Sequence, residues 1–438
     1  MRPLLLLLVA ALVATVPTMS LPSGSAQAAQ AAQASEVPVH LLWRADTSTG
    51  FDGWALDGVR ATEGGLLLDT ASLPANDSPT MNAGSPAHAD LADLGGLQRP
   101  SDRAGVAVGP VQMTAAPFSE LIPSWNAVTP PGTWIEIRLR ARLGGDDGRW
   151  TRWYELGSWT SDAGPDRRQS VKGQHDDDGR VSTDTLVLSA PASAHQMAFV
   201  LHSDAPTPDA SALPTPDASP LITLAAVLAS APSPDARVVP PNASAWGTTV
   251  NVPERSQMVY AGGGPVWCSP TSTSMVMAYW ADRIGNAALN QPVPTVAAAV
   301  YDPIYRGNGN WPFNTAYAGR DGLRAYVSRM SSLAQVEHWI VAGLPVVASL
   351  AWEPGELGSA AAVPSTNGHL LVIVGFTASG DVVVNDPAAD PRLGLTVRRV
   401  YPRAALERLW LTHSGGTVYL IYPDGQQLPS SDAAFGAW

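Results

Sequence analysis

The chain has a single cysteine, Cys268, among 438 residues, so no disulfide can form within it. It is also poor in positive charge, because 26 Lys and Arg stand against 38 Asp and Glu. The formal net charge of -12 excludes a typical nucleic-acid-binding protein, which needs basic surface to contact phosphates. A hydrophobic content of 45% excludes a disordered chain, and the length exceeds that of one ordinary core. We therefore expect two folded domains.

Long apolar stretches are scarce as well, and the main one, residues 4–16, stands near the start of the chain. It is shorter than the roughly 20 residues that a membrane-spanning helix needs. It follows Arg2 and leads into Ala-Gln-Ala triplets within residues 26–34, which is the order of a secretory signal. We expect residues 1–34 to be a signal peptide, and the mature protein to be secreted and without a membrane span.

Strand-like patterns fill residues 35–230. In residues 134–140 three aliphatic side chains alternate with charged or polar ones, which is typical of a strand with one buried face. Other short candidates, separated by Gly, Pro, Asp and Ser clusters, lie at residues 66–68, 150–156, 185–188, 197–201 and 221–228. The spacing predicts an antiparallel β-sandwich. The Pro-rich residues 205–219 suit an exposed loop, and residues 231–250 suit a linker between domains.

Two further features of this region each have two interpretations. The tryptophans pack in the core or, as the alternative, form an aromatic face that contacts a polysaccharide; they are Trp43, Trp54, Trp125, Trp134, Trp150, Trp153 and Trp159. The acidic residues 175–179 suit a solvated turn, and their spacing differs from that of an established calcium loop. We favour core packing and a turn.

Residues 251–438 have a different pattern, with helices expected at 270–281, 294–300 and 323–330. Ser332 and Gln335 have the spacing of a capping box, which predicts a further helix that ends at Gly343. Apolar runs then predict strands at residues 346–351, 370–376, 382–385 and 417–422. Helices followed by an antiparallel sheet indicate an α+β domain.

The cysteine lies at the start of the first of these helices. Ser269 is a good N-cap and Pro270 suits the first helical position, so the thiol is expected at a helix N-terminus. The helix dipole and free N–H groups favour a thiolate there, which is a nucleophile. Upstream, Gln257 provides an amide donor, and the glycines at 262–264 allow close approach of the backbone.

A thiolate nucleophile needs a base, and three histidines follow Cys268. His338 falls within the capped helix and His413 in a polar turn, whereas His369 opens an apolar strand. If Phe376 pairs with Asp381 across the next turn, the two residue numbers in every cross-strand pair of this hairpin add up to 757. Asp386 then lies diagonally across from His369, within side-chain reach. A slip of one residue would place Asn385 there instead, and Asn is also able to orient an imidazole.

These motifs resemble a known family. Its pattern is matched by Gln257, residues 267–272, residues 343–347, Gly368-His369 with residues 374–376, and residues 385–387. Together they resemble the papain-like double-glycine (bacteriocin-processing) peptidases, cysteine peptidase family thirty-nine, in the secreted "like" branch. The resemblance covers about residues 251–422.

The resemblance implies a papain-like fold in which Cys268 attacks, His369 is the base and Asp386 orients it. It also implies that Gln257 and the backbone N–H of Cys268 form the oxyanion hole. Ser269 departs from the Gly that often follows the cysteine in such domains. The transporter-linked leader processing of founding members is not carried over, and similar secreted proteins occur in actinobacteria.

Residues 308–318 are rich in Gly, Asn and aromatic residues, so we expect them to form one wall of a substrate cleft. The expected substrate-binding residues are Trp267, Asn310, Trp311 and Asn314. For Trp311 and Phe313, packing into the core is an equally good expectation.

The sequence thus predicts a secreted cysteine peptidase that cleaves peptide or related amide bonds, including cell-wall-derived peptides, through a thioester. Two alternatives stay open: a non-catalytic binding protein on a papain-like frame, and a cell-wall peptide amidase or transferase with the same triad. No cofactor is expected, and no metal, because the histidines and carboxylates of the second domain lack ligand spacing.

Overall fold

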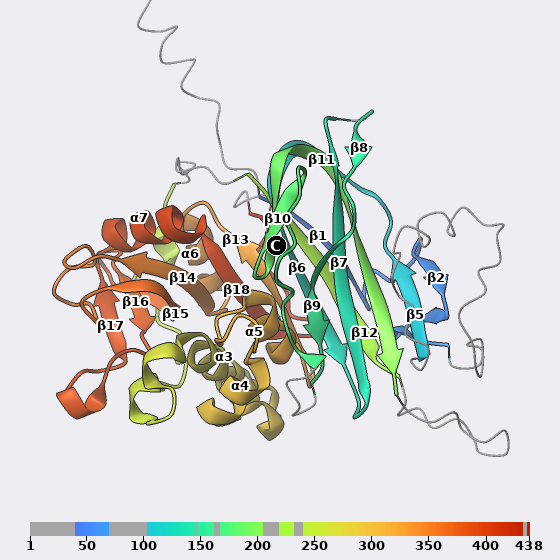
Figure 1. Cartoon of the computed structure of the whole chain (residues 1–438). Coiled ribbons are helices and arrows are strands. Elements are labelled where there is room, and N and C mark those ends of the chain that lie inside the picture. The colour runs from blue at the N-terminus through green and yellow to red at the C-terminus, as the bar shows by residue number, and fades with distance from the viewer. Residues whose placement is uncertain are drawn as a thin grey trace, which may run out of the picture. The chain divides into compact units, whose positions relative to one another are not determined.

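The computed structural model describes residues 40–69, 103–145, 147–161, 167–204, 219–231, 240–431 and 436–438. Pro38–Trp438 form one compact unit, which contains two sheets (Figure 1). The expected signal peptide lies outside the described residues, as do residues 205–218 of the Pro-rich repeat and residues 232–239 of the expected linker. Within the described part, no helix is both long and apolar enough to cross a bilayer.

The first sheet is antiparallel throughout and has the order β2-β5-β11-β6-β12-β4-β3, while β1 pairs with β12, β10 with β11, and β7 with β8, β9 and β11. Its strands are β1 (His40–Asp46), β2 (Ala55–Asp57), β3 (Val59–Thr62), β4 (Gly65–Leu68), β5 (Arg103–Val108), β6 (Gln112–Val128), β7 (Thr133–Leu143), β8 (Arg149–Trp150), β9 (Tyr154–Trp159), β10 (Gly179–Ser182), β11 (Thr185–Ser203) and β12 (Leu221–Ser230). The strand β11 pairs with β10 and β6 near its start and with β5 and β7 near its end. Hydrogen bonds therefore join all strands into one sheet, where the sequence predicted a sandwich. The two predicted strands 185–188 and 197–201 are both parts of β11.

The tryptophans of this sheet pack inside, as expected. Trp54, Trp125, Trp134, Trp153 and Trp159 are buried, and Trp43 and Trp150 are partly buried. The Arg140 guanidinium lies over the rings of Trp150 and Trp153, 4.6 Å from each centroid. Polysaccharide contact stays a prediction.

The acidic residues 175–179 form the turn before β10. Asp176 accepts hydrogen bonds from Arg152 and Tyr154, and Asp178 pairs with Arg149. Arginines therefore neutralise Asp176 and Asp178. Among the described residues, no group of three or more His, Cys, Asp or Glu is placed to hold a metal ion.

The second sheet is antiparallel, with the order β13-β18-β14-β15-β16-β17. Its strands are β13 (Leu323–Arg329), β14 (Val346–Trp352), β15 (Thr366–Phe376), β16 (Val382–Asn385), β17 (Arg398–Tyr401) and β18 (Thr417–Pro423). The helices are α3 (Cys268–Ile284), α4 (Val293–Val300), α5 (Trp311–Ala318), α6 (Leu333–Val341) and α7 (Arg403–Ser414). The helix α3 packs against β15, α7 against β14, and α5 against β13 (Figure 1).

Two expectations for this part were wrong, and one helix was not predicted. Residues 323–330 were expected to be helical, but β13 pairs with β18 over its whole length, so the neighbouring strand overrides local preference. Residues 308–318, for which no helix was predicted, contain the helix Trp311–Ala318. Ser332 does not cap α6 through its side chain; the Gln335 side chain instead accepts a hydrogen bond from the Ser331 N–H at 2.7 Å.

The free edge of β13 is covered by side chains of β6. The Asn126 amide donates to the Ala325 carbonyl at 2.8 Å and accepts from the Ala325 N–H at 3.1 Å, as a strand would. The Ser124 hydroxyl accepts from the Val327 N–H at 2.9 Å. Buried backbone groups need such partners, so these contacts join the first sheet to the second. One hydrophobic core runs through both.

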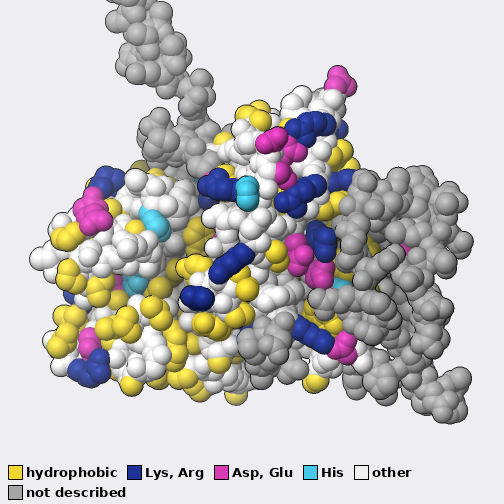
Figure 2. All heavy atoms as spheres, in the orientation of Figure 1, with side chains coloured by type: hydrophobic (Ala, Val, Ile, Leu, Met, Phe, Trp, Pro, Cys, Tyr) yellow, Lys and Arg dark blue, Asp and Glu magenta, His cyan; other side chains and the backbone are white. Residues whose placement is uncertain are grey.

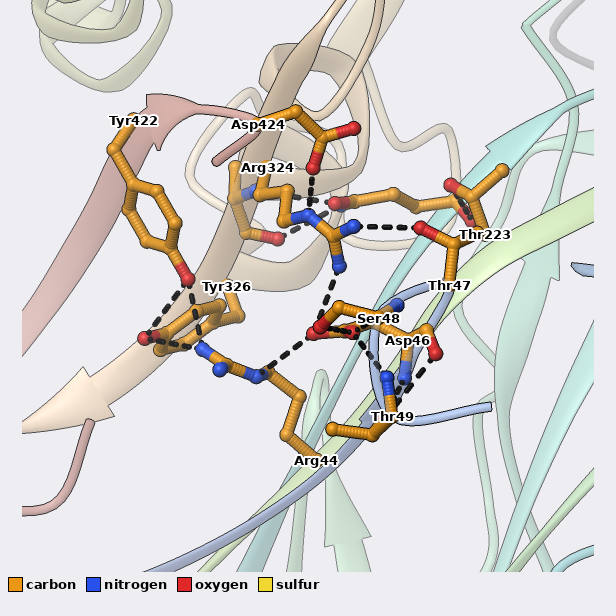
Figure 3. Close-up of polar contacts among 12 residues, drawn as sticks. Arg44, Asp46, Thr47, Ser48, Thr49, Thr223, Arg324, Tyr326, Tyr422 and Asp424 are labelled. Atoms are coloured by element: carbon orange, nitrogen blue, oxygen red, sulfur yellow. Dashed lines mark hydrogen bonds and ion pairs between the residues drawn. The ribbon is translucent and has the colours of Figure 1, made fainter. Parts of the chain in front are cut away.

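A buried ionic cluster lies beside this junction (Figure 3). Asp46, which is 1% exposed, pairs with Arg44 at 3.1 Å and with Arg324 at 2.8 Å. Arg44 also donates to the Tyr422 hydroxyl at 2.8 Å. Burial alone would raise the pKa of Asp46, but the Ser48 hydrogen bonds and the two arginines outweigh it and hold the pKa low. Asp46 therefore stays ionised between β1 and β13.

The cluster predicts unequal effects for the two carboxylates that bind Arg324. Asp46→Asn leaves two arginines without their buried partner, so we expect the free energy of unfolding, measured in urea, to fall by about 3 kcal/mol. Asp424→Asn removes a 56% exposed partner of the same arginine and is expected to cost less than about 1 kcal/mol. Equal losses in the two variants would contradict a role for burial.

Candidate active site

Cys268 is the first residue of α3, so the thiol lies at a helix N-terminus, as predicted. The cap differs from the expectation, because Trp267 occupies the N-cap position and makes no side-chain cap bond. Ser269 lies inside the helix and its hydroxyl pairs with that of Tyr419 at 2.9 Å, so it does not face the cleft. Pro270 is the third helical residue, where the missing N–H costs no helical hydrogen bond.

His369 and Asp386 are joined directly. The His369 Nε2 lies 2.8 Å from the Asp386 Oδ1, and both residues are almost fully buried. The other ring nitrogen, Nδ1, is therefore the one left to face Cys268, and His369 lowers the pKa of the Cys268 thiol. The Trp352 ring meets the imidazole edge to face, with the centroids 5.4 Å apart. Asp386 thus holds His369 by a hydrogen bond, and His369 lines the same cleft as Cys268 and interacts with its thiol.

A β-bulge sets the register that brings Asp386 to His369. Near the turn Phe376 pairs with Val382, one residue away from the predicted partner. A register shift between Ile373 and Gly375 then restores the predicted sum of 757, with Val372 opposite Asn385. Asn385 donates to the Val252 carbonyl instead, so Asp386 is the residue that contacts the imidazole.

The pKa values of this group favour an ion pair. Burial alone would raise the pKa of the Cys268 thiol, but His369 and the N–H groups of Leu370 and Ser269 outweigh it and lower the pKa. Burial alone would lower the pKa of His369, but Asp386 and Cys268 raise it well above its usual range. The pKa of Asp386 is lowered, because His369 and Tyr401 outweigh burial. The site therefore favours a thiolate and an imidazolium over the neutral thiol and imidazole.

Gln257 is buried near this group but does not line the cleft. Its backbone N–H donates to the Pro387 carbonyl at 2.9 Å, which ties it to the segment after Asp386. Its side-chain nitrogen donates to the Gly264 carbonyl, which leaves one amide hydrogen. A role for Gln257 in an oxyanion hole stays a prediction. Position 263 requires a glycine, because a Cβ there would overlap the Trp267 ring.

Cys268 and His369 open into a cleft of about 1020 Å³. Its lining is mostly apolar or aromatic and includes Val266, Trp267, Pro294, Ala297, Tyr301, Tyr305 and Trp311. Trp267 and Trp311 therefore lie where the sequence placed them, and Phe313 is buried in the core.

Asn310 and Asn314, also expected to bind substrate, do not line the cleft. Asn310 caps α5 by accepting from the Phe313 N–H at 3.2 Å. Asn314 is fully buried and donates to the carbonyls of Asn308 and Asn310 at 2.8 Å. Both amides shape the wall of the cleft and are committed to its backbone.

Two family models match this chain. Residues 42–217 match the Peptidase C39 N-terminal domain, and residues 249–418 match the Peptidase_C39 like family. The second match contains Cys268, His369 and Asp386.

The chain belongs to the C39-like peptidase family. A comparison with curated proteins found no match. The family indicates a cysteine peptidase-like role, and the C39-like domain, with α3 packed on an antiparallel sheet, fits the papain-like fold. We call residues 42–217 the N-terminal domain from here on.

The N-terminal domain supplies one wall of the cleft, which the sequence did not predict. The turn between β10 and β11, residues 182–185, lines the cleft together with Cys268. Asp184 in this turn accepts a hydrogen bond from the Trp311 N–H at 2.8 Å. Burial raises the pKa of Asp184 to about 6. No local pattern signals such a contact, because its two ends lie 127 residues apart.

The same domain also holds the C-terminal end of α4 and the loop that follows it. The Arg168 guanidinium donates to the carbonyls of Ala298 and Tyr301, at 2.9 and 3.3 Å. The Ser170 N–H donates to the Asp302 carboxylate at 3.2 Å. Since this loop lines the C39-like domain's cleft, the cleft depends on both parts of the chain.

Tyr401 is a second residue that sequence reasoning missed. Its hydroxyl donates to the Asp386 Oδ2 at 2.6 Å, while the Ala388 N–H donates to Oδ1 at 2.8 Å. The strand β17 that carries Tyr401 was not predicted, because its short run of arginines has no clear alternation. Tyr401 therefore helps to keep Asp386 ionised.

The ion pair predicts the pH dependence of iodoacetamide alkylation. Because His369 lowers the pKa of the thiol, we expect Cys268 to react rapidly at pH 5 to 6. In His369→Ala, burial raises that pKa, so alkylation should begin only near or above the ordinary thiol value of about 8.5. Cys268→Ser is the labelling control, measured by mass spectrometry. A wild-type profile that rises only near pH 8.5 would contradict the ion pair.

Tyr401→Phe tests the support of Asp386. Loss of the hydroxyl raises the pKa of Asp386 and weakens its stabilisation of the imidazolium, so the alkylation midpoint should move upward by about one pH unit. The matched control is Tyr279→Phe, whose hydroxyl donates to the Gly343 carbonyl and should leave the midpoint unchanged. The same shift in both variants would indicate a general loss of stability.

Proposed function

We propose that this protein is a secreted cysteine peptidase that cleaves peptide or related amide bonds through a Cys268–His369–Asp386 triad. The observation that carries the proposal is the 2.8 Å contact between His369 and Asp386, with His369 lining an open cleft beside a cysteine at a helix N-terminus whose pKa it lowers. The match to a peptidase family over the same residues supports it. Secretion rests on the signal-like residues 1–34.

The chemistry starts from the ion pair. The Cys268 thiolate attacks the scissile carbonyl, and the imidazolium of His369 donates its proton to the leaving amine as the C–N bond breaks. The product is a thioester between Cys268 and the acyl part of the substrate. Neutral His369 then accepts a proton from water as its oxygen attacks the thioester, and the released thiolate restores the resting state.

The negative oxygen formed in each step needs donors. The backbone N–H of Cys268, at the start of α3, and the remaining amide hydrogen of Gln257 are the proposed ones. Asp386 keeps the imidazole ring in one orientation throughout and stabilises its charged form. A cleft of about 1020 Å³ leaves room for several residues of an extended peptide.

The test is hydrolysis of an internally quenched peptide library at pH 7. Cys268→Ser and His369→Ala are each expected to lose on the order of a thousandfold or more in kcat/KM, because nucleophile and base act as a unit. Asp386→Ala should lose less, on the order of a hundredfold, and its alkylation profile should move toward that of an ordinary thiol.

A thioester adduct on Cys268, detected by intact mass after mixing with a peptide ester, would identify the intermediate. Rapid alkylation without turnover of any library member would contradict a peptidase and leave a non-catalytic binding protein on the same frame. Residual hydrolysis that is equal in wild type and Cys268→Ser would assign the activity to a contaminant.

A further inference from the structure

A second pocket continues the cleft past the β10–β11 turn. It measures about 420 Å³ and shares Thr183, Tyr305 and Arg306 with the cleft that contains Cys268. Its other lining residues come from residues 170–173, Val181 and Ile304. The two pockets therefore adjoin at the turn between β10 and β11, and we call them together the groove.

Two cations line the second pocket, Lys172 and Arg306. Lys172 is the single lysine of the chain. Both side chains are exposed, and neither forms a salt bridge with a carboxylate among the described residues, whereas Arg149 and Arg152 on the same domain are paired. Two cations without a salt bridge among the described residues, lining one pocket, attract an anionic group locally.

Two buried carboxylates beside this pocket accept hydrogen bonds from the backbone and form no salt bridge with either cation among the described residues. Asp302 is fully buried and accepts hydrogen bonds from the N–H groups of Ser170, Ile304 and Tyr305. Asp184 is 8% exposed and accepts from Trp311. Both are committed to the backbone that shapes the groove.

The backbone at this point is held in an uncommon conformation. Thr183 and Arg306 have φ values of 57° and 61°, and these two are among three non-glycine residues with positive φ in the described part of the chain. The Arg306 N–H donates to the Asp302 carbonyl at 2.7 Å, and the Asp184 N–H to the Ser182 carbonyl at 2.7 Å. Such strain persists only where the surroundings enforce it, and it is concentrated at binding sites.

Figure 2 shows the side chains of the molecule in the orientation of Figure 1. Basic side chains lie among apolar and neutral ones in the region between β10 and α4, without acidic side chains next to them. The groove therefore combines an apolar section beside Cys268 with a cationic section beyond Thr183.

We propose that the groove binds a peptide across the β10–β11 turn, with the scissile carbonyl at Cys268 and a carboxylate of the same peptide at Lys172 and Arg306. This inference rests on the proposed function and names the substrate class: peptides with an acidic group at a fixed distance from the cleaved bond. The carboxylate belongs either to a Glu or Asp side chain or to the C-terminus, and the test separates these sources.

The experiment measures kcat/KM for quenched peptides in which Glu or Gln is placed at each position in turn, with the C-terminus either free or amidated. At one position we expect Glu, or at the end the free carboxylate, to be favoured by about fivefold at low salt, and less at high salt. The preference should disappear in Lys172→Gln and in Arg306→Gln. In Lys172→Glu it should reverse, so that Lys is favoured over Gln at that position.

Arg180→Gln is the matched control, because Arg180 is exposed on β10 and lines neither pocket. It should keep the wild-type preference. Equal rates for Glu and Gln at every position, or a preference that survives both Lys172→Gln and Arg306→Gln, would overturn the inference while the peptidase stands.

A separate measurement covers the case in which wild type cleaves nothing. Peptides of the same Glu and Gln series are then tested for protection of Cys268 against iodoacetamide. Protection by the acidic peptides, lost in Lys172→Gln, would support the cationic section although the proposed reaction fails. Equal protection by both series would overturn it.

Discussion

The edge of β13 is completed by side chains instead of by another strand, and the arrangement of the cleft depends on this. A buried strand edge leaves N–H and C=O groups that must find partners. Asn126 satisfies both groups of Ala325, and Ser124 satisfies Val327. Because β6 is thereby set against the second sheet, the neighbouring strands β10 and β11 deliver their turn to the cleft.

The chemistry of the site depends on balanced burial. His369 and Asp386 are both removed from water, which would neutralise each of them alone. Their contact at 2.8 Å, with Tyr401 and Ala388 on the carboxylate, keeps the charges in place. The helix N-terminus adds donors on the Cys268 side. The charged state thus arises from partners that lie on four different elements or their flanks, and no single element creates it.

Much of the C39-like domain could be predicted from local pattern. The sequence placed Cys268 on a helix start, and it placed β14, β15, β16 and β18 within a few residues, because apolar periodicity and glycine turns are local signals. It also placed Asp386 near His369. The predicted pairing next to the turn was wrong by one residue, and a β-bulge that the sequence does not reveal restores the predicted pairing closer to His369. The strand β13 was predicted as a helix, because its seven residues acquire their preference from β18. Contacts such as that of Asp184 with Trp311 join distant segments and leave no local trace.

The turn of residues 182–185 belongs to the N-terminal domain but lines the cleft that contains Cys268. A change of length or composition in this turn would alter the shape of the cleft while Cys268, His369 and Asp386 stay untouched. The N-terminal domain is therefore more than a separate module that recombination could exchange freely.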